Sequence, residues 1–150
     1  MKVTIIIPTF NASDNLNLSL PFFEELSNHA NFDVCFIDSL SKDDTLKRLV
    51  DCDLRLIGEV DPDEFDHGGT RTFYGRLSEG DIVLYLTQDA LPFSVSDVER
   101  LVSVFHDKNV GAAFGRQIPY KETSLFGKHL RKFNYNDESY IRDINDKDLY

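Results

Sequence analysis

The sequence has few cysteines, a shortage of positive charge and no long apolar run. Its two cysteines, Cys35 and Cys52, form no CxxC pair, which indicates a reduced, cytoplasmic protein. No apolar stretch approaches the roughly 18 residues that cross a bilayer. Met1-Lys2 leads directly into an apolar run, so no signal peptide is predicted. The 26 Asp and Glu outnumber the 16 Lys and Arg, and this net charge of −10 argues against non-specific nucleic-acid binding.

Several phosphate-binding and catalytic motifs are also absent. The sequence contains no GxGxxG, no GxxxxGKS or GxxxxGKT, and no GxSxG. A dinucleotide-binding fold of the GxGxxG type, a P-loop NTPase and a hydrolase with a nucleophile elbow are therefore not predicted. The four histidines lack the spacing of metal ligands.

Apolar, β-branched runs alternate with segments of helical spacing. A helix is predicted over Asn15–Ser27, and Pro21 should introduce a kink in it. Two more helices are predicted after Ser41–Asp44 and Ser96–Glu99, which resemble capping boxes, and a fourth begins at His67-Gly68-Gly69. Strands buried on both faces are predicted at Val3–Ile7, Phe32–Ile37, Leu54–Ile57, 82–86 and Val110–Phe114. This alternation predicts an α/β fold, with a mainly parallel sheet and helices on both of its faces.

Polar residues follow the predicted strands where each one ends. Thr9 and Asn11 follow the first strand, Asp38 the second, and Asp89 the run in DIVLYLTQDALP. Open parallel sheets bind ligands at the carboxyl ends of their strands. Asp89 is therefore the first candidate for a functional acid, and the alternative is a turn or helix-cap aspartate.

Six segments together resemble a known family. VTIIIPTFN and FIDSLSKDDT, followed by a strand that ends in aspartate, resemble the amino-terminal, donor-binding part of family 2 glycosyltransferases with the GT-A fold, the nucleotide-diphospho-sugar transferase fold. Within that family, DEFDHGGTR, VLYLTQDALP, FGRQIPY and FNYNDESYIRD are similar to the rhamnosyltransferase branch. The resemblance implies an inverting enzyme that transfers a sugar, L-rhamnose from dTDP-rhamnose, to a polysaccharide or lipid-linked acceptor.

The resemblance also implies a donor site for a dTDP- or UDP-sugar. Asp38 would accept a hydrogen bond from the pyrimidine N3–H, Arg71 would face the diphosphate or the base, and Asp89 would hold Mg²⁺ or Mn²⁺. Thr87 stands where the usual DxD motif has its first aspartate, so one carboxylate remains for the metal. The other implied donor-site residues are Pro8, Thr9, Phe10, Asn11, His67 and Gln88.

The same resemblance divides the chain into an α/β core and an incomplete remainder. Residues 1–120 would form the nucleotide-sugar-binding core, and residues 121–150 would begin the acceptor side. The family's general base is expected beyond Tyr150, so no catalytic residue is assigned. The alternative function is therefore a non-catalytic nucleotide-sugar-binding fragment or interaction module. The aromatics of residues 126–140 are predicted to be core or subunit contacts, and apolar surface at the incomplete edge favours homo-oligomers. The longer parent would work in the cytoplasm, at the inner face of the membrane.

Overall fold

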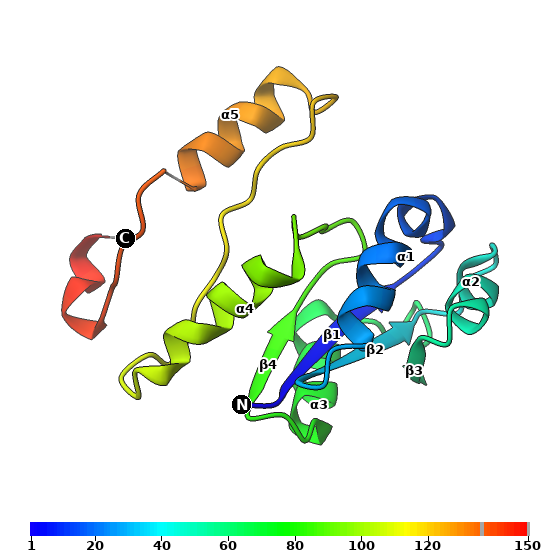
Figure 1. Cartoon of the computed structure of the whole chain (residues 1–150). Coiled ribbons are helices and arrows are strands. Elements are labelled where there is room, and N and C mark those ends of the chain that lie inside the picture. Colours follow the sequence, from blue (N-terminus) through cyan, green and yellow to red (C-terminus); the bar gives the residue numbers. More distant parts are fainter. Residues whose placement is uncertain (136, 150) are drawn as a thin grey trace. The chain divides into compact units, whose positions relative to one another are not determined.

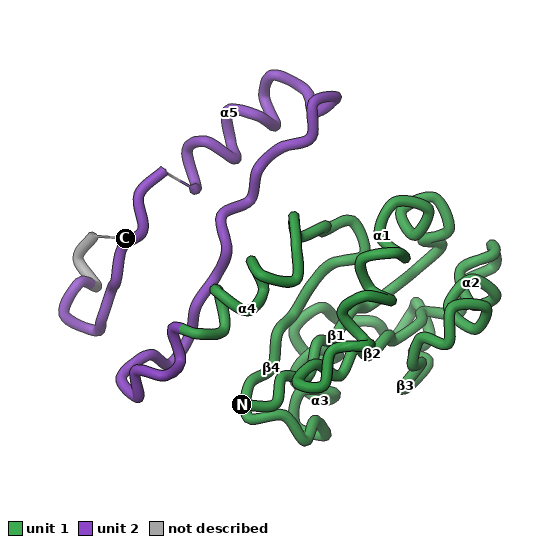
Figure 2. Tube along the Cα trace, viewed as in Figure 1, with its two compact units in different colours: residues 1–103 green, residues 104–150 purple. Residues whose placement is uncertain are grey.

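The computed structural model of the chain describes residues 1–135 and 137–149. The chain divides into two compact units, residues 1–103 and residues 104–150 (Figure 2). Among the described helices, none has the length and apolar character that crossing a bilayer requires. The functional boundary predicted at residue 120 stays a prediction.

The first unit is an α/β layer structure, and the second consists of helical segments joined by irregular chain (Figure 1). The second unit contains the short 3-10 helix η1 (Val104–His106), helix α5 (Leu125–Asn134) and the 3-10 helix η2 (Ile144–Leu149). The first unit contains, in chain order, β1 (Val3–Thr9), α1 (Ser13–Ser27), β2 (Phe32–Asp38), α2 (Thr45–Asp51), β3 (Arg55–Glu59), α3 (His67–Leu77), β4 (Ile82–Tyr85) and α4 (Val95–Ser103).

All four strands of the sheet run parallel, in the order β3-β2-β1-β4. Helix α1 packs against β2 and α2, whereas α3 packs against β1. Because βαβ crossovers are right-handed, the return from β3 to β4 places α3 on the face opposite α1 and α2 (Figure 1). The predicted parallel α/β fold with helices on both faces is confirmed.

The core lies around the two central strands. Ile5, Ile6 and Ile7 of β1 are fully buried, and Phe36 of β2 meets Phe23 of α1 edge to face, with ring centroids 5.4 Å apart. Burial of such β-branched and aromatic side chains on both faces is the reason these runs form central strands. Helix α1 continues through Pro21 instead of splitting there. Pro21 is exposed, so water can bond the carbonyl that loses its amide partner.

The sequence predicted that Pro8 would end the first strand, but Pro8 lies inside β1. Ile6 accepts a hydrogen bond from the Leu86 amide, and Thr9 accepts one from the Ser39 amide. Because bonding direction alternates along a strand, position 8 faces the β4 side, where the paired register ends at Ile6–Tyr85. The amide that proline lacks would therefore have no ladder partner.

The outer strand β4 differs from its prediction. Its run was expected to be buried on both faces, but β4 pairs only with β1, its residues are half-buried, and Tyr85 is 42% exposed. The predicted strand Val110–Phe114 does not form, and Phe114 is 64% exposed. A strand needs a partner for its backbone groups, and Gly111, Ala112 and Ala113 offer little apolar area to hold one.

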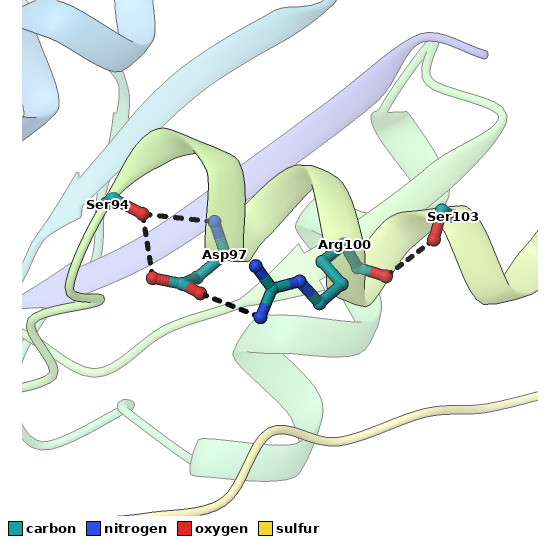
Figure 3. A network of polar contacts seen from close by, with 4 residues as sticks. All are labelled: Ser94, Asp97, Arg100 and Ser103. Carbon is teal, nitrogen blue, oxygen red and sulfur yellow. Dashed lines mark hydrogen bonds and ion pairs between the residues drawn. The ribbon is translucent and has the colours of Figure 1, made fainter.

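The amino-terminal cap of α4 lies two residues earlier than its sequence pattern indicated. Ser94 Oγ accepts a hydrogen bond from the Asp97 amide at 3.2 Å and donates to Asp97 Oδ2 at 2.7 Å (Figure 3). Arg100 Nη1 lies 3.6 Å from Asp97 Oδ1 one turn later. Because the helix begins at Val95, its amino terminus is capped by Ser94 and Asp97, and not by Ser96 and Glu99 as predicted.

Replacing Thr4 by valine is expected to raise the free energy of unfolding by about 1 kcal/mol, because an unsatisfied buried hydroxyl is removed. Thr4 is 3% exposed, and its Oγ1 has no hydrogen-bond partner among the described residues. Urea unfolding followed by circular dichroism measures the change. A loss of stability in Thr4→Val would show that the hydroxyl is bonded after all.

Candidate functional site

The strand order places the loops that follow β1 and β4 next to each other at the carboxyl edge of the sheet. The chain moves from β1 outward to β2 and β3, then returns to place β4 on the other side of β1. The helices that follow β1 and β4 lie on the same side of the sheet, because α4 contacts α1 and Glu99 Oε1 lies 3.3 Å from His29 Nε2. The carboxyl ends of parallel strands are where open α/β sheets bind ligands. The predicted common edge for Pro8, Asp38 and Asp89 agrees with this parallel arrangement.

Asp38 ends β2 and is enclosed by its own chain. It is 0% exposed and pairs in register with Thr9 of β1. Its Oδ1 accepts hydrogen bonds from Ser41 Oγ at 2.6 Å and Thr9 Oγ1 at 3.2 Å, and its Oδ2 accepts from the Ser41 amide at 2.7 Å. A carboxylate has about four acceptor positions, so three are occupied within the protein.

Four consecutive backbone amides after β1 donate to side chains from other loops. We call this arrangement the loop clamp. Its amides belong to residues 10–13. The acceptors, in the same order, are Gln88 Oε1 at 2.8 Å, Ser41 Oγ at 2.8 Å, Thr45 Oγ1 at 2.7 Å and Asp43 Oδ2 at 3.0 Å.

The loop clamp holds two residues with left-handed backbone conformations. Asn11 has φ 46° and Leu40 has φ 55°. Asparagine tolerates this region, and Asn11 Oδ1 accepts from the Lys42 amide at 2.9 Å. Leucine does not favour it, so the bonds from the Ser39 and Ser41 amides on either side must hold Leu40 in place.

The predicted capping box at Ser41–Asp44 is wrong. Helix α2 begins at Thr45, and the Asp44 side chain makes no capping bond. Ser41 is instead engaged by Asp38 and by the Asn11 amide. Asp43 takes the capping role, since its Oδ1 accepts from the Thr45 amide at 3.0 Å. The local pattern was ambiguous because the serine has a stronger partner elsewhere in the chain.

Hydrogen bonds stabilise the charged form of Asp43. Burial acts to raise its pKa, but the bonds from Thr45 and Ser13 outweigh burial and lower the pKa from 3.8 to about 2. A carboxyl whose pKa falls on folding contributes stability above its unfolded pKa, and that contribution is lost as the pH falls toward the folded pKa.

We expect Asp43→Asn to lower the free energy of unfolding at neutral pH by about 1 kcal/mol, because the amide nitrogen of asparagine cannot accept the bond that one carboxylate oxygen takes from the Ser13 or Thr45 amide. The difference from the unmodified chain should shrink between pH 4 and pH 2, because the carboxyl protonates across the window between 3.8 and about 2. Urea unfolding at several pH values measures it. A difference that is constant over this window would contradict the lowered pKa.

Gln88 and Asp89 follow β4 in a turn closed by the Ala90 amide, which donates to the Thr87 carbonyl at 2.9 Å. Gln88 bonds the backbone of Phe10 through both ends of its amide, with Nε2 donating to the Phe10 carbonyl at 3.3 Å. It therefore joins the β4 loop to the β1 loop. Asp89 is exposed beside this junction.

The predicted metal ligand stands without a cluster of further ligands. Among the residues that the structure describes, no group of three or more His, Cys, Asp or Glu could hold a metal ion. A single exposed carboxylate fits Mg²⁺ or Mn²⁺ only when substrate phosphates and water complete the coordination. Asp89 is such an exposed carboxylate, and its role as a metal ligand stays a prediction.

Helix α3 brings His67 and Arg71 to the same edge. Its cap is Asp66, whose side chain accepts from the Gly69 amide. Arg71 Nη1 lies 3.2 Å from His67 Nδ1, and its Nε is buried without a partner among the described residues. Tyr85 OH, at the end of β4, donates to the Arg71 carbonyl at 3.1 Å.

Sequence reasoning missed the residues that hold the site together. Ser41, Asp43, Thr45 and Tyr85 bond the backbones of the loops that carry the predicted residues. The one available signal was the polar run after Asp38, which was interpreted mainly as the start of a helix. Of the predicted donor-site residues, the structure joins Thr9, Phe10, Asn11, Asp38 and Gln88 directly or through Ser41, while His67 and Arg71 form a separate pair on α3.

The fold is shared with solved glycosyltransferases. A mannosyltransferase from Pyrobaculum calidifontis, in complex with GDP-Man and Mn²⁺, matches with a TM-score of 0.62 and 24% identity, over 73% of this chain and 34% of that one. TarS 1-349 of S. aureus, in complex with UDP-GlcNAc, matches with a TM-score of 0.58 and 20% identity, over 81% of this chain and 39% of that one. The predicted GT-A-like fold is confirmed.

Two curated relatives are similar across nearly the whole chain. The O-antigen chain rhamnosyltransferase WbaN of Salmonella anatum is 37% identical over 145 residues, which is 95% of this chain and 45% of that protein. RfbN of Salmonella typhimurium, described in the same words, is 34% identical over 143 residues, with the same shares. The chain thus spans a little under half the length of these relatives. The family described as Glycosyl transferase family 2 matches residues 4–149, and the chain belongs to that family.

Proposed function

We propose that this chain is the donor-binding part of a glycosyltransferase that transfers L-rhamnose from dTDP-rhamnose, with inversion, to a polysaccharide or lipid-linked saccharide in the cytoplasm. The observation that carries the proposal is the 37% and 34% identity to two O-antigen chain rhamnosyltransferases over 95% of the chain. The exposed carboxylate of Asp89, which follows β4 at the carboxyl edge of the sheet, supports it.

The loop clamp determines which groups meet the diphosphate. The amides of residues 10–13 already donate to side chains, so this loop cannot cradle phosphate in the manner of a glycine-rich loop. Compensation of the negative charge is left to Arg71, to the first amides of α3 and to a cation on Asp89. A bound Mg²⁺ or Mn²⁺ would supply charge compensation for the leaving diphosphate.

The nucleoside would lie against Pro8, Thr9, Phe10 and Asn11, with Asp38 behind them. Phe10 is 47% exposed, which leaves an aromatic surface available to a base. Asp38 has one acceptor position beyond its three internal bonds. Since Asp38 is fully enclosed, we propose that N3–H of the base reaches it by displacing the Ser41 hydroxyl.

The test is calorimetry of dTDP and dTDP-rhamnose with Mg²⁺, with UDP-glucose as the comparison. Asp89→Asn is expected to weaken binding by about 10- to 100-fold, the range for losing a partner of a charged group. Excess chelator should remove the difference between the two proteins. Asp51→Asn, an exposed aspartate at the opposite end of α2, is the matched control and should bind normally. Equal affinity of Asp89→Asn and the unmodified chain in Mg²⁺ would contradict the metal role.

A second function, donor binding without transfer, is favoured for the 150 residues themselves. The chain spans 45% of the length of its rhamnosyltransferase relatives, and no general base is assigned within it. Transfer of labelled rhamnose to an acceptor distinguishes the two functions. We expect binding without turnover, since positioning of the acceptor alone supplies roughly 7–11 kcal/mol of the barrier reduction. Acceptor-dependent turnover by the 150-residue chain would rule out the second function.

A further inference from the structure

Helix α5 has two chemically different faces. It runs over Leu125–Asn134, and Ser124 caps it by accepting from the Gly127 amide at 3.2 Å. Leu125, Phe126, Leu130 and Phe133 recur at spacings that gather on one side of a helix, and Lys128, Arg131 and Lys132 fall on the other. The helix therefore has an apolar face and a basic face.

The apolar face of α5 is exposed. Leu125 is 87% exposed, Phe126 72% and Phe133 79%. Helix α4 is also amphipathic, but it packs its apolar side chains, and Val98 and Val102 are 3% and 7% exposed. Of the two alternatives predicted for Phe126 and Phe133, a core role is wrong within the described residues, and subunit contacts stay a prediction. Large apolar side chains left in water at such a density indicate an interaction surface.

Positive charge gathers on the same helix, in a chain that is strongly acidic overall. Residues 1–103 carry eight Lys or Arg and nineteen Asp or Glu, whereas residues 104–150 carry eight and seven. Lys128, Arg131 and Lys132 line a hollow of about 240 Å³ together with Arg116. Arg116 pairs with Asp137 at 2.5 Å. No acidic partner for Arg131 or Lys132 is present among the residues described.

We propose that α5 is an interfacial helix that binds the surface of an anionic phospholipid membrane. Leu125, Phe126 and Phe133 would enter the boundary between headgroups and acyl chains, while the basic face bonds lipid phosphates. A helix with this division of side chains lies in the plane of the interface, and anionic lipids attract its Lys and Arg. At ten residues, about 15 Å, α5 lies on the membrane and does not cross it.

The positive charge of α5 favours binding to an anionic lipid surface over binding to a second copy of the chain. A symmetric dimer through α5 would pair identical surfaces and bring two sets of basic side chains together. An anionic bilayer instead supplies opposite charge and apolar depth at the same place. The inference stands apart from the proposed function, because membrane binding requires neither nucleotide nor metal.

The test is sedimentation of the 150-residue chain with vesicles of phosphatidylcholine alone or mixed with phosphatidylglycerol. We expect binding to the anionic vesicles only, and loss of that binding between about 0.05 M and about 0.5 M NaCl, where screening becomes short-ranged. Neutralising Lys128, Arg131 and Lys132 to glutamine should weaken partitioning roughly 100-fold, because each basic residue near an anionic surface contributes about fivefold.

A matched control removes the same charge elsewhere. Lys47, Arg76 and Lys108 are exposed, and their triple change to glutamine should leave binding within about twofold of the unmodified chain. Phe126→Ser with Phe133→Ser should also abolish binding, with unchanged circular dichroism. Equal binding to neutral vesicles, or equal loss in both triple variants, would overturn the proposal. So would an absence of vesicle binding combined with a dimer that the double serine variant dissociates, since a second copy would then cover α5.

Discussion

Replacing Asp38 with alanine is expected to lower the free energy of unfolding by about 3 kcal/mol, the largest effect of any single change at the site. The carboxylate accepts two bonds from Ser41 and one from Thr9, and Asp38 is 0% exposed. Alanine leaves the Ser41 amide without an acceptor and removes the support of Leu40 in its left-handed conformation. Urea unfolding measures the loss. A change below about 1 kcal/mol would show that water replaces the carboxylate.

Asp38→Asn separates the structural role from base recognition. An asparagine keeps one oxygen for the Ser41 amide, and the Ser41 and Thr9 hydroxyls can reorient to accept from its amide group. The stability loss should therefore fall to about 1 kcal/mol. Thymine and uracil present a donor at N3, but cytosine presents an acceptor there. The unmodified chain should prefer dTDP to CDP, and Asp38→Asn should lose that preference in calorimetry. A retained preference would exclude a direct bond between Asp38 and the base.

Thr45→Val is expected to lower the free energy of unfolding by about 2–3 kcal/mol, although valine has nearly the same shape. Thr45 is 0% exposed, and its Oγ1 accepts from the Ala12 amide at 2.7 Å and donates to Asp43 Oδ1. Ala12 is also fully buried, so its amide would lose its partner where water is excluded. The pKa of Asp43 should rise at the same time, because a hydrogen bond that lowers it is removed.

Thr4→Val is the natural comparison for this variant. Both threonines are buried, and the chemical change is identical, but only the hydroxyl of Thr45 has partners. The two variants should therefore shift the urea midpoint in opposite directions. A loss of stability in both variants would show that the Thr4 hydroxyl is bonded as well.

The central strands and the edge that carries the site were predictable because they depend on local pattern and topology. The run Ile5–Ile7 identifies a buried strand, and parallel strands must end at one edge, which places Asp38 and Asp89 on the same edge of the sheet. The bonds of Ser41 and Thr45 were not predictable, because each joins residues about 30 positions apart in loops of irregular conformation. The exposure of β4 and α5 was not predictable either. An apolar pattern shows that a strand or helix can be buried, but it does not show whether another element packs against it.

The loop clamp also determines which segments must be exchanged together when this site is grafted into another protein. Amides of residues 10–13 find acceptors in residues 41–45 and in Gln88, so no one of these loops has its backbone bonds satisfied by itself. A chimera that exchanged only the segment after β2 with that of another family member would leave amides after β1 unpaired. Grafts that alter donor preference should therefore carry residues 9–13, 38–45 and 87–89 together, as one inherited block.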